Sequence, residues 1–303
     1  MAKIVNQING WIIIDKPYEM GSTTVVNHLK RLLHPSKIGH AGTLDPLATG
    51  VLPIALGQAT KTIPYVMDGK KVYQFEVTWG KETSTDDLEG EVLFQSDKRP
   101  SREEIEAILP FFIGEISQVP PMYSAIKING ERAYDLARKG VDVELKPRLV
   151  TVEELKILSH SEDKTLFEVV CSKGTYVRSL GHDMGRKLGC YGYITLLRRT
   201  KCGPFSLNHS ILLEKFEKEE YNALNLPLIG ILTALDDILV LAVDSEMASM
   251  LRQGKALKAK TVCNNQNFQM GQVLALALDQ EPIALVKYEK GLFKPFRVFP
   301  AEN

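Results

Sequence analysis

A run of twelve residues, Gly39 to Gly50, constrains the fold more than any other part of the chain. It holds three glycines, one proline and a single carboxylate, that of Asp45. Glycine permits a positive φ and close backbone approach, and Pro46 fixes the turn directly after the acid, so the run suits neither a regular helix nor a central strand. We expect a rigid loop that presents Asp45 in one direction. The alternative is a surface Asp that only stabilises its own turn, which is commoner for an isolated Asp near glycine.

Hydrophobic periodicity predicts strands and helices in mixed order. Short apolar or alternating runs predict strands at 11–14, 73–79 and 166–171. Helical spacing of apolar residues predicts helices after Gly21-Ser22 and over 180–188, the second ended by Gly189. Because there is no regular βαβ repeat, the pattern favours an α+β architecture over a doubly wound sheet.

The segment from about 97 to 148 differs in character from its surroundings. Ser101 and Glu104 have the spacing of a capping box, and a proline-punctuated stretch at 119–127 follows. A short helix is expected from 131 to 139, ending at Gly140. We expect this whole segment to be an insertion that stands off the sheet of a domain covering 1–238.

The final part of the chain, 239–303, is predicted to form a second, small β-rich domain. Asp244 or Ser245 can cap a helix that ends at Gly254. Strands are expected at 271–278, 283–287 and 294–299. One short helix with several short strands is typical of a small β-barrel module.

Composition narrows the functional classes. Lys plus Arg and Asp plus Glu both number 37, so binding to nucleic acid would have to come from local basic patches. No apolar run approaches the roughly 20 residues that span a bilayer, and the first residues lack the apolar core of a signal peptide, which favours the cytoplasm. Four separated cysteines and six histidines show no zinc spacing, and dinucleotide and Walker motifs are missing, so we expect no metal and no cofactor.

Five blocks of the sequence belong together. Two are highly specific: the 39–50 run, continued by Gly-Gln-Ala-Thr-Lys at 57–61, and Cys-Ser-Lys-Gly-Thr-Tyr-Val-Arg at 171–178. The other three are Asp-Lys-Pro at 15–17, Lys-Val-Tyr at 71–73 and Leu-Leu-Arg-Arg-Thr at 196–200. Together they resemble the TruB family of pseudouridine synthases, bacterial enzymes that modify uridine 55 of tRNA, over about residues 10 to 205. The resemblance implies a mixed, mainly antiparallel sheet with flanking helices, an insertion that grips RNA and a C-terminal PUA-like domain.

The resemblance also implies roles for individual residues. Asp45 would be the catalytic group, and Arg178 would pair with it and hold its pKa low. Tyr73 would stack on the target uracil, and Tyr176 and Leu197 would line the uracil pocket. Taken alone, Tyr73 and Leu197 also suit a hydrophobic core, and Arg178 also suits a structural ion pair.

The implied substrate is the T-arm stem-loop of tRNA, whose target base must be flipped out of a folded loop to reach Asp45. His40 would contact the extruded nucleotide or fill the space it vacates, although a His in a glycine-rich loop is more often structural. Six cations near the five blocks are candidate RNA-backbone contacts: Lys16, Lys61, Lys127, Arg198, Arg199 and Lys201. We expect no membrane association, no obligate protein partner and a monomer.

Two other functional classes compete with a stand-alone enzyme. One is an RNA-binding factor for tRNA folding in which catalysis is secondary, but the Asp45, Tyr73 and Arg178 set disfavours a purely non-catalytic module. The other is the catalytic subunit of a guide-RNA-dependent complex. Such subunits typically carry strongly basic tails, whereas this sequence finishes with Phe-Pro-Ala-Glu-Asn.

Overall fold

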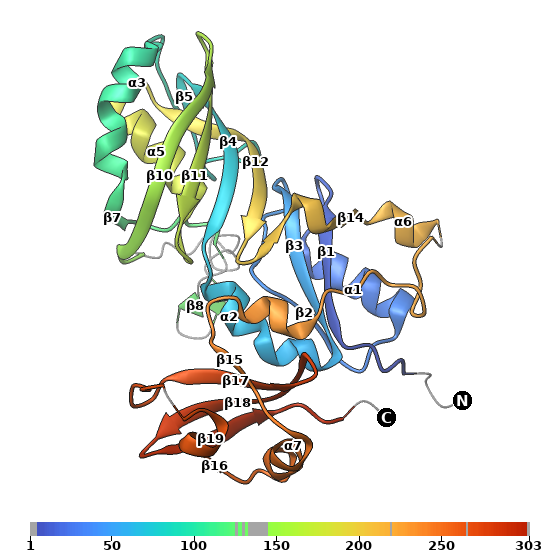
Figure 1. Ribbon diagram of the computed structural model, residues 1–303. Helices are drawn as coiled ribbons and strands as arrows, with labels where there is room; N and C mark the ends of the chain where they lie inside the picture. The colour runs from blue at the N-terminus through green and yellow to red at the C-terminus, as the bar shows by residue number, and fades with distance from the viewer. Residues whose placement is uncertain are drawn as a thin grey trace.

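The computed structural model describes residues 5–124, 127–128, 131–132, 145–218, 220–264 and 266–301 (Figure 1). The architecture is α+β, as predicted: a large mixed sheet with flanking helices is followed by a separate β-rich domain. No helix in these ranges is long and apolar enough to cross a membrane.

The large sheet has ten strands and is mainly antiparallel. Its main path runs in the order β14 (Ser210–Leu212), β1 (Gly10–Lys16), β3 (Thr49–Leu56), β12 (Gly192–Cys202), β4 (Lys71–Trp79), β11 (Lys164–Cys171), β10 (Arg148–His160) and β7 (Gly114–Gln118). Off this path, β2 (Ile38–His40) pairs with β3 and β13 (Phe205–Ser206) pairs with β12. The predicted strands at 11–14, 73–79 and 166–171 are confirmed as parts of β1, β4 and β11.

A seam divides this sheet between β3 and β12. The two strands are parallel and are registered through two pairs, Arg198 with Thr49 and Arg199 with Gly50. At Gly50 φ is +101°, and a Cβ there would lie 2.2 Å from the carbonyl oxygen of Arg199, so only glycine permits the close approach. We call β14, β1, β3 and β2 the smaller half, and β12, β4, β11, β10 and β7 the larger half.

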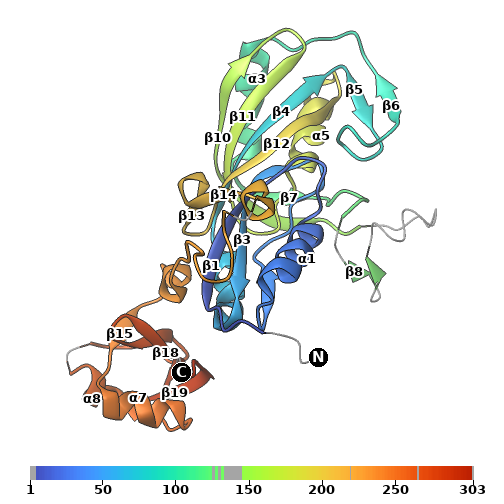
Figure 2. The same cartoon turned by 90° about the vertical axis from the view of Figure 1, so that its right-hand side faces the viewer.

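Each half has its own hydrophobic core. On the smaller half, α1 (Ser22–Leu33) buries Val25, Leu29 and Leu33 against β1 and β3, and Figure 2 shows it alongside these strands. On the larger half, α5 (Val177–Leu188) buries Leu180 and Met184 against β4 and β11. The helix predicted over 180–188 is therefore confirmed. Its predicted end is confirmed too, because Gly189 caps α5 with a φ of +68°.

The prediction for 97–148 is wrong in its first part. The capping box of Ser101 and Glu104 does start a helix, α3 (Arg102–Ile108), which leads into the 3₁₀ turn η2 (Leu109–Phe112). However, Ile105 and Phe112 are buried in the core of the larger half, and β7 pairs with β10. Residues 102–118 therefore belong to the sheet and to the layer that packs on it, because their apolar side chains pack against strands from distant parts of the sequence. Beyond them, β8 (Lys127–Ile128) and β9 (Glu131–Arg132) form a separate hairpin, and most of the predicted 131–139 helix lies outside the described residues.

The C-terminal domain is a five-stranded sheet with two short helices, close to the predicted elements. Its strand order is β15 (Val240–Ala242), β17 (Val273–Leu278), β18 (Glu281–Glu289), β19 (Leu292–Val298) and β16 (Leu257–Lys258), with α7 (Ser245–Arg252) and α8 (Ala259–Val262). One face packs on the main domain, because Ala275, Leu285 and Phe299 share a core with Trp11 and Ile231.

The remaining elements are short. They are the hairpin β5 (Lys81–Thr83) and β6 (Val92–Gln95), helices α2 (Ile63–Asp68) and α6 (Glu214–Glu217), and the 3₁₀ turns η1 (Gly57–Thr62), η3 (Leu207–His209) and η4 (Ile231–Leu235). The β5–β6 hairpin matters for the site, because its turn region lies against the start of α5.

Candidate active site

Asp45 lies in the loop between β2 and β3, at the seam of the sheet. The loop is held in place by its own backbone and by α1: the N–H of Leu44 donates to the Ser22 hydroxyl at 2.8 Å, and that hydroxyl donates to the Leu44 carbonyl at 3.0 Å. The Ala48 N–H donates to the Asp45 carbonyl at 3.1 Å. Gly42 adopts a φ of +93°. The sequence prediction of a fixed loop is confirmed.

Lys16 holds the loop through hydrogen bonds from its buried side chain. Its side chain is 0% exposed. Its Nζ donates to three carbonyl oxygens, those of Pro17 at 2.8 Å, Met20 at 2.5 Å and Pro46 at 3.1 Å. Burial lowers the pKa of Lys16 to about 8, against an opposing pull from the Asp45 carboxylate. The predicted phosphate contact is wrong for Lys16, because its ammonium is buried and bonded to three carbonyl oxygens of the protein.

Arg199 is a second buried cation, 1% exposed. Its Nε donates to the Val51 carbonyl at 2.8 Å and one terminal nitrogen donates to the Gly42 carbonyl at 3.0 Å, so it joins the two ends of the loop. Its guanidinium also interacts with the Tyr73 hydroxyl, whose pKa burial raises to about 12. The prediction of a phosphate contact is wrong here too, since burial keeps the guanidinium from an RNA backbone.

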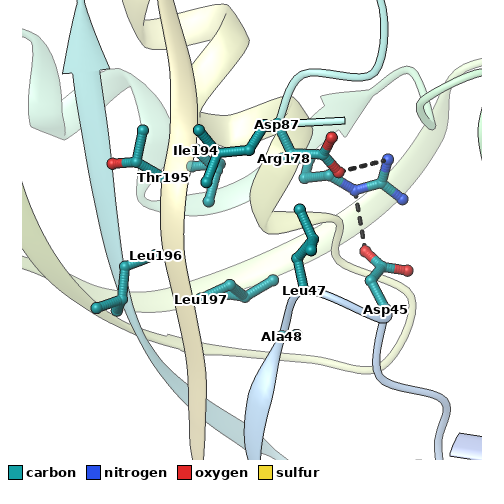
Figure 3. Close-up of a pocket in the computed structure, with 10 residues that line it drawn as sticks. Asp45, Leu47, Ala48, Asp87, Arg178, Ile194, Thr195, Leu196 and Leu197 are labelled. Atoms are coloured by element: carbon teal, nitrogen blue, oxygen red, sulfur yellow. Dashed lines mark ion pairs between the residues drawn. The ribbon is translucent and has the colours of Figure 1, made fainter. Parts of the chain in front are cut away.

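Arg178 faces Asp45 from the first turn of α5 (Figure 3). The Arg178 side chain is 5% exposed and that of Asp45 is 40% exposed, and Nε of Arg178 lies 3.0 Å from Oδ2 of Asp45. The Nε–H does not point along this line, so the contact is an ion pair without a hydrogen bond. The two terminal nitrogens donate to backbone carbonyls, of Thr85 at 3.0 Å and of Tyr123 at 2.7 Å, which fixes the plane of the guanidinium beside the carboxylate.

A cavity in front of Asp45 brings together the residues predicted to meet the uracil. Tyr73, Tyr176, Arg178 and Leu197 all line it with Asp45. These four residues come from β4, the residue before α5, α5 itself and β12, all in the larger half. Asp45 comes from the smaller half, so the site is assembled from both sides of the seam. Burial raises the pKa of Tyr176 as well as that of Tyr73, so both phenols are neutral.

A second cavity adjoins the first and shares Asp45, Arg178 and Leu197 with it. Its wall includes Leu47 and Asp87 (Figure 3). The Asp87 carboxylate lies 3.6 Å from Arg178, on the side away from Asp45. Sequence reasoning missed Asp87, although the polar run at 84–87 between two short strands was a signal for a functional loop.

His40 lies at the end of β2, just before the loop. Burial and the neighbouring Arg199 cation lower its pKa, so the ring is neutral, and its Nδ1 is buried with no hydrogen-bond partner among the described residues. It is not in the wall of the two cavities around Asp45. Its contact with an extruded nucleotide stays a prediction.

The other candidate cations have diverse surroundings. Arg198 makes a two-point ion pair with Asp15, at 2.7 and 3.0 Å. Lys61 donates to the carbonyl of Val298 in the C-terminal domain at 2.5 Å. Lys201 is exposed, and Lys127 lies in β8, with its side chain outside what the structure describes. RNA contacts by these four stay predictions.

Comparison with known proteins shows the family of this chain. Residues 30–177 match the family described as TruB family pseudouridylate synthase (N terminal domain), and residues 178–240 match the tRNA pseudouridylate synthase B C-terminal domain. Proteins named tRNA pseudouridine synthase B from Brucella ovis and Sinorhizobium medicae are both 48% identical to this chain. The alignments cover 97% and 96% of this chain and 96% of each relative.

The chain belongs to the TruB family of pseudouridine synthases. Solved structures share the fold: an H/ACA RNP bound to a substrate RNA containing 2′-deoxyuridine matches with a TM-score of 0.73 at 23% identity, over 96% of this chain and 85% of that one. A Cbf5-Nop10-Gar1 complex matches with a TM-score of 0.71 at 25% identity, over 96% and 84%. For this TruB-family chain, the described residues contain no cluster of three or more His, Cys, Asp or Glu arranged to hold a metal.

Proposed function

We propose that this protein isomerises uridine 55 in the TΨC arm of tRNA to pseudouridine, as a monomer in the cytoplasm. The observation that carries the proposal is the single cavity shared by Asp45, Tyr73, Tyr176, Arg178 and Leu197. The name of the relatives of this chain, tRNA pseudouridine synthase B, supports tRNA as the substrate. One chain supplies all five residues, which favours a monomer without an obligate protein partner.

The reaction needs one well-placed carboxylate. The N1–C1′ bond breaks, the freed uracil turns within the cavity, and C5 joins C1′; the proton leaving C5 is balanced by the proton that N1 gains. No electron or phosphoryl group is transferred. Asp45 acts either as a nucleophile, at C1′ or on the ring, or as the base that removes the C2′ proton. Arg178, fixed by two carbonyls, orients the carboxylate in each case.

The aromatic walls account for retention of the free base. A uracil cleaved from its ribose must stay in place while it rotates, and stacking on the Tyr73 ring supplies about 1–3 kcal/mol. Leu197 and Tyr176 close the cavity around it. A base that is stacked within a folded RNA loop cannot enter the cavity, so the target nucleotide is flipped out of the loop before it meets Asp45.

Contacts with the RNA backbone fall to local cations, since the net charge is zero. Arg198, beside the seam, and the exposed Lys201 are the candidates nearest the site on β12, and Lys61 and Lys127 extend the set. In this proposal the C-terminal domain, 239–303, adds affinity for tRNA rather than chemistry.

The deciding experiment incubates the purified protein with an unmodified tRNA transcript and no guide RNA. We expect pseudouridine at position 55, and we expect Asp45→Asn to lower the rate at least about 10²–10⁴-fold while tRNA binding persists. Residual turnover of Asp45→Asn within tenfold of the unmodified enzyme would reject Asp45 as the catalytic group. Activity only with an added guide RNA, or binding without conversion, would reject the proposed function.

A further inference from the structure

Gln118, the last residue of β7, is a buried amide that the proposed chemistry leaves without a role. Its side chain is 2% exposed, and it does not line the cavities around Asp45. Its Oε1 accepts from the Tyr176 N–H at 2.8 Å, and its Nε2 donates to the Tyr176 carbonyl at 3.0 Å. The amide thus pairs with both polar groups of one backbone residue, as a neighbouring strand would.

Tyr176 is the position where this clamp has most effect. It is the N-cap residue of α5, and its own side chain makes no cap hydrogen bond. The first N–H groups of a helix have no partner within the helix, so its start depends on groups supplied from elsewhere. Gln118 supplies one such group from β7, far earlier in the chain, by accepting from the N–H of Tyr176.

The same short segment contacts the next residues of α5. The Ser179 hydroxyl donates to the Val119 carbonyl at 2.8 Å, and Arg178 donates to the Tyr123 carbonyl at 2.7 Å. Residues 118–123 therefore hold the start of α5 at three residues, Tyr176, Arg178 and Ser179. This is the helix turn that carries the Tyr176 ring into the cavity and Arg178 to Asp45.

We propose that Gln118 is a positioning residue for the isomerisation: its amide fixes the backbone of Tyr176, and through it the placement of Arg178 against Asp45. This inference rests on the proposed function. Arg178 has little freedom to correct a displaced helix, because both of its terminal nitrogens are already held by the Thr85 and Tyr123 carbonyls. A displacement of about 1 Å in such a constellation costs about 100-fold in rate.

The test is Gln118→Met, which keeps the length of the side chain and removes both hydrogen bonds. Single-turnover conversion of the tRNA transcript, with enzyme in excess, separates the rate at saturation from the half-saturating enzyme concentration. We expect the saturated rate to fall about 10- to 100-fold, and the half-saturating concentration to change less than about threefold. Gln118→Glu, which keeps the acceptor for the Tyr176 N–H, should lose less.

Thr165→Val is the matched control. Thr165 is equally buried, in β11, and its hydroxyl also makes two hydrogen bonds, with Trp79 Nε1 at 2.9 Å and His160 Nδ1 at 2.7 Å. It lies outside the cavities around Asp45. Folded Thr165→Val protein should therefore keep the saturated rate of the unmodified enzyme, even where its thermal stability falls as much as that of Gln118→Met.

A double-mutant cycle with Arg178→Lys completes the test. If Gln118 acts through Arg178, then Gln118→Met should cost little more in the Arg178→Lys background. Effects that multiply would overturn the proposal, as would a folded Gln118→Met with the saturated rate of Thr165→Val. Should Gln118→Met fail to fold, a normal saturated rate for Gln118→Glu overturns it and a reduced rate supports it. An inactive unmodified enzyme would instead refute the proposed function.

Discussion

Lys16 makes the stability of this protein depend on pH in a direction that can be worked out from the structure. Its ammonium is fully buried, and burial lowers its pKa from 10.5 to about 8. In the unfolded chain the amine is exposed and keeps its ordinary pKa. Between about pH 8 and pH 10.5 the unfolded state therefore binds more protons than the folded state, so the free energy of unfolding rises with pH through this window.

The magnitude follows from the shift. A fall of between two and three pKa units corresponds to about 3 kcal/mol, which is a large fraction of the about 5–15 kcal/mol that separates folded from unfolded domains. Lys16→Met removes the titrating group and keeps the length of the side chain. We subtract the unfolding free energy of Lys16→Met from that of the unmodified protein. This difference should increase by about 2–3 kcal/mol from pH 7.5 to pH 10.5.

Urea unfolding followed by circular dichroism, at both pH values and without RNA, measures this difference. Groups other than Lys16 titrate in both proteins and cancel. Lys30→Met, at an exposed position of α1, controls for the loss of one positive charge. The reasoning would be refuted if this difference in unfolding free energy decreased at high pH. That result would mean that the three carbonyls of Pro17, Met20 and Pro46 favour the ammonium more than burial disfavours it.

Three further predictions concern the site and the domains. Tyr73→Phe keeps the stacking face and should retain base binding but lose single-turnover rate, whereas Tyr73→Leu should lose both; normal rates in both variants, measured beside thermal melts, would remove Tyr73 from the site. A chain truncated after residue 238, once circular dichroism shows it folded, should bind tRNA more weakly by filter binding, and unchanged affinity would disprove the role of the C-terminal domain. EDTA treatment should leave activity on a prefolded tRNA arm intact, and a loss restored specifically by zinc would contradict this.

Local sequence signals predicted the parts of the fold that are determined locally. The rigid loop around Asp45 follows from glycine and proline, and the end of α5 follows from Gly189, because both depend on backbone preferences of a few adjacent residues. The pairing of Arg178 with Asp45 came from family resemblance, since no local pattern brings a helix start to a loop more than a hundred residues away.

The errors share a physical cause. Lys16 and Arg199 were predicted to bind phosphate because a cation in a sequence gives no sign of the carbonyls that surround it in the fold. Residues 102–118 were predicted to stand off the sheet because the partner of β7, β10, comes after the intervening hairpin. Asp87 and Gln118 were missed for the same reason: each is a single polar residue whose partners are far along the chain.

The seam between β3 and β12 has a consequence for how the site can vary in time. Asp45 belongs to the half packed around α1, and Arg178 to the half packed around α5, and Tyr73 and Leu197 pack against both cores. A small rotation of one half against the other would change the separation of the Asp45 and Arg178 side chains directly. Two ladder pairs and the buried Arg199 resist that rotation. The distance between Asp45 and Arg178 thus depends on the stiffness of the seam as well as on the contacts that hold the start of α5.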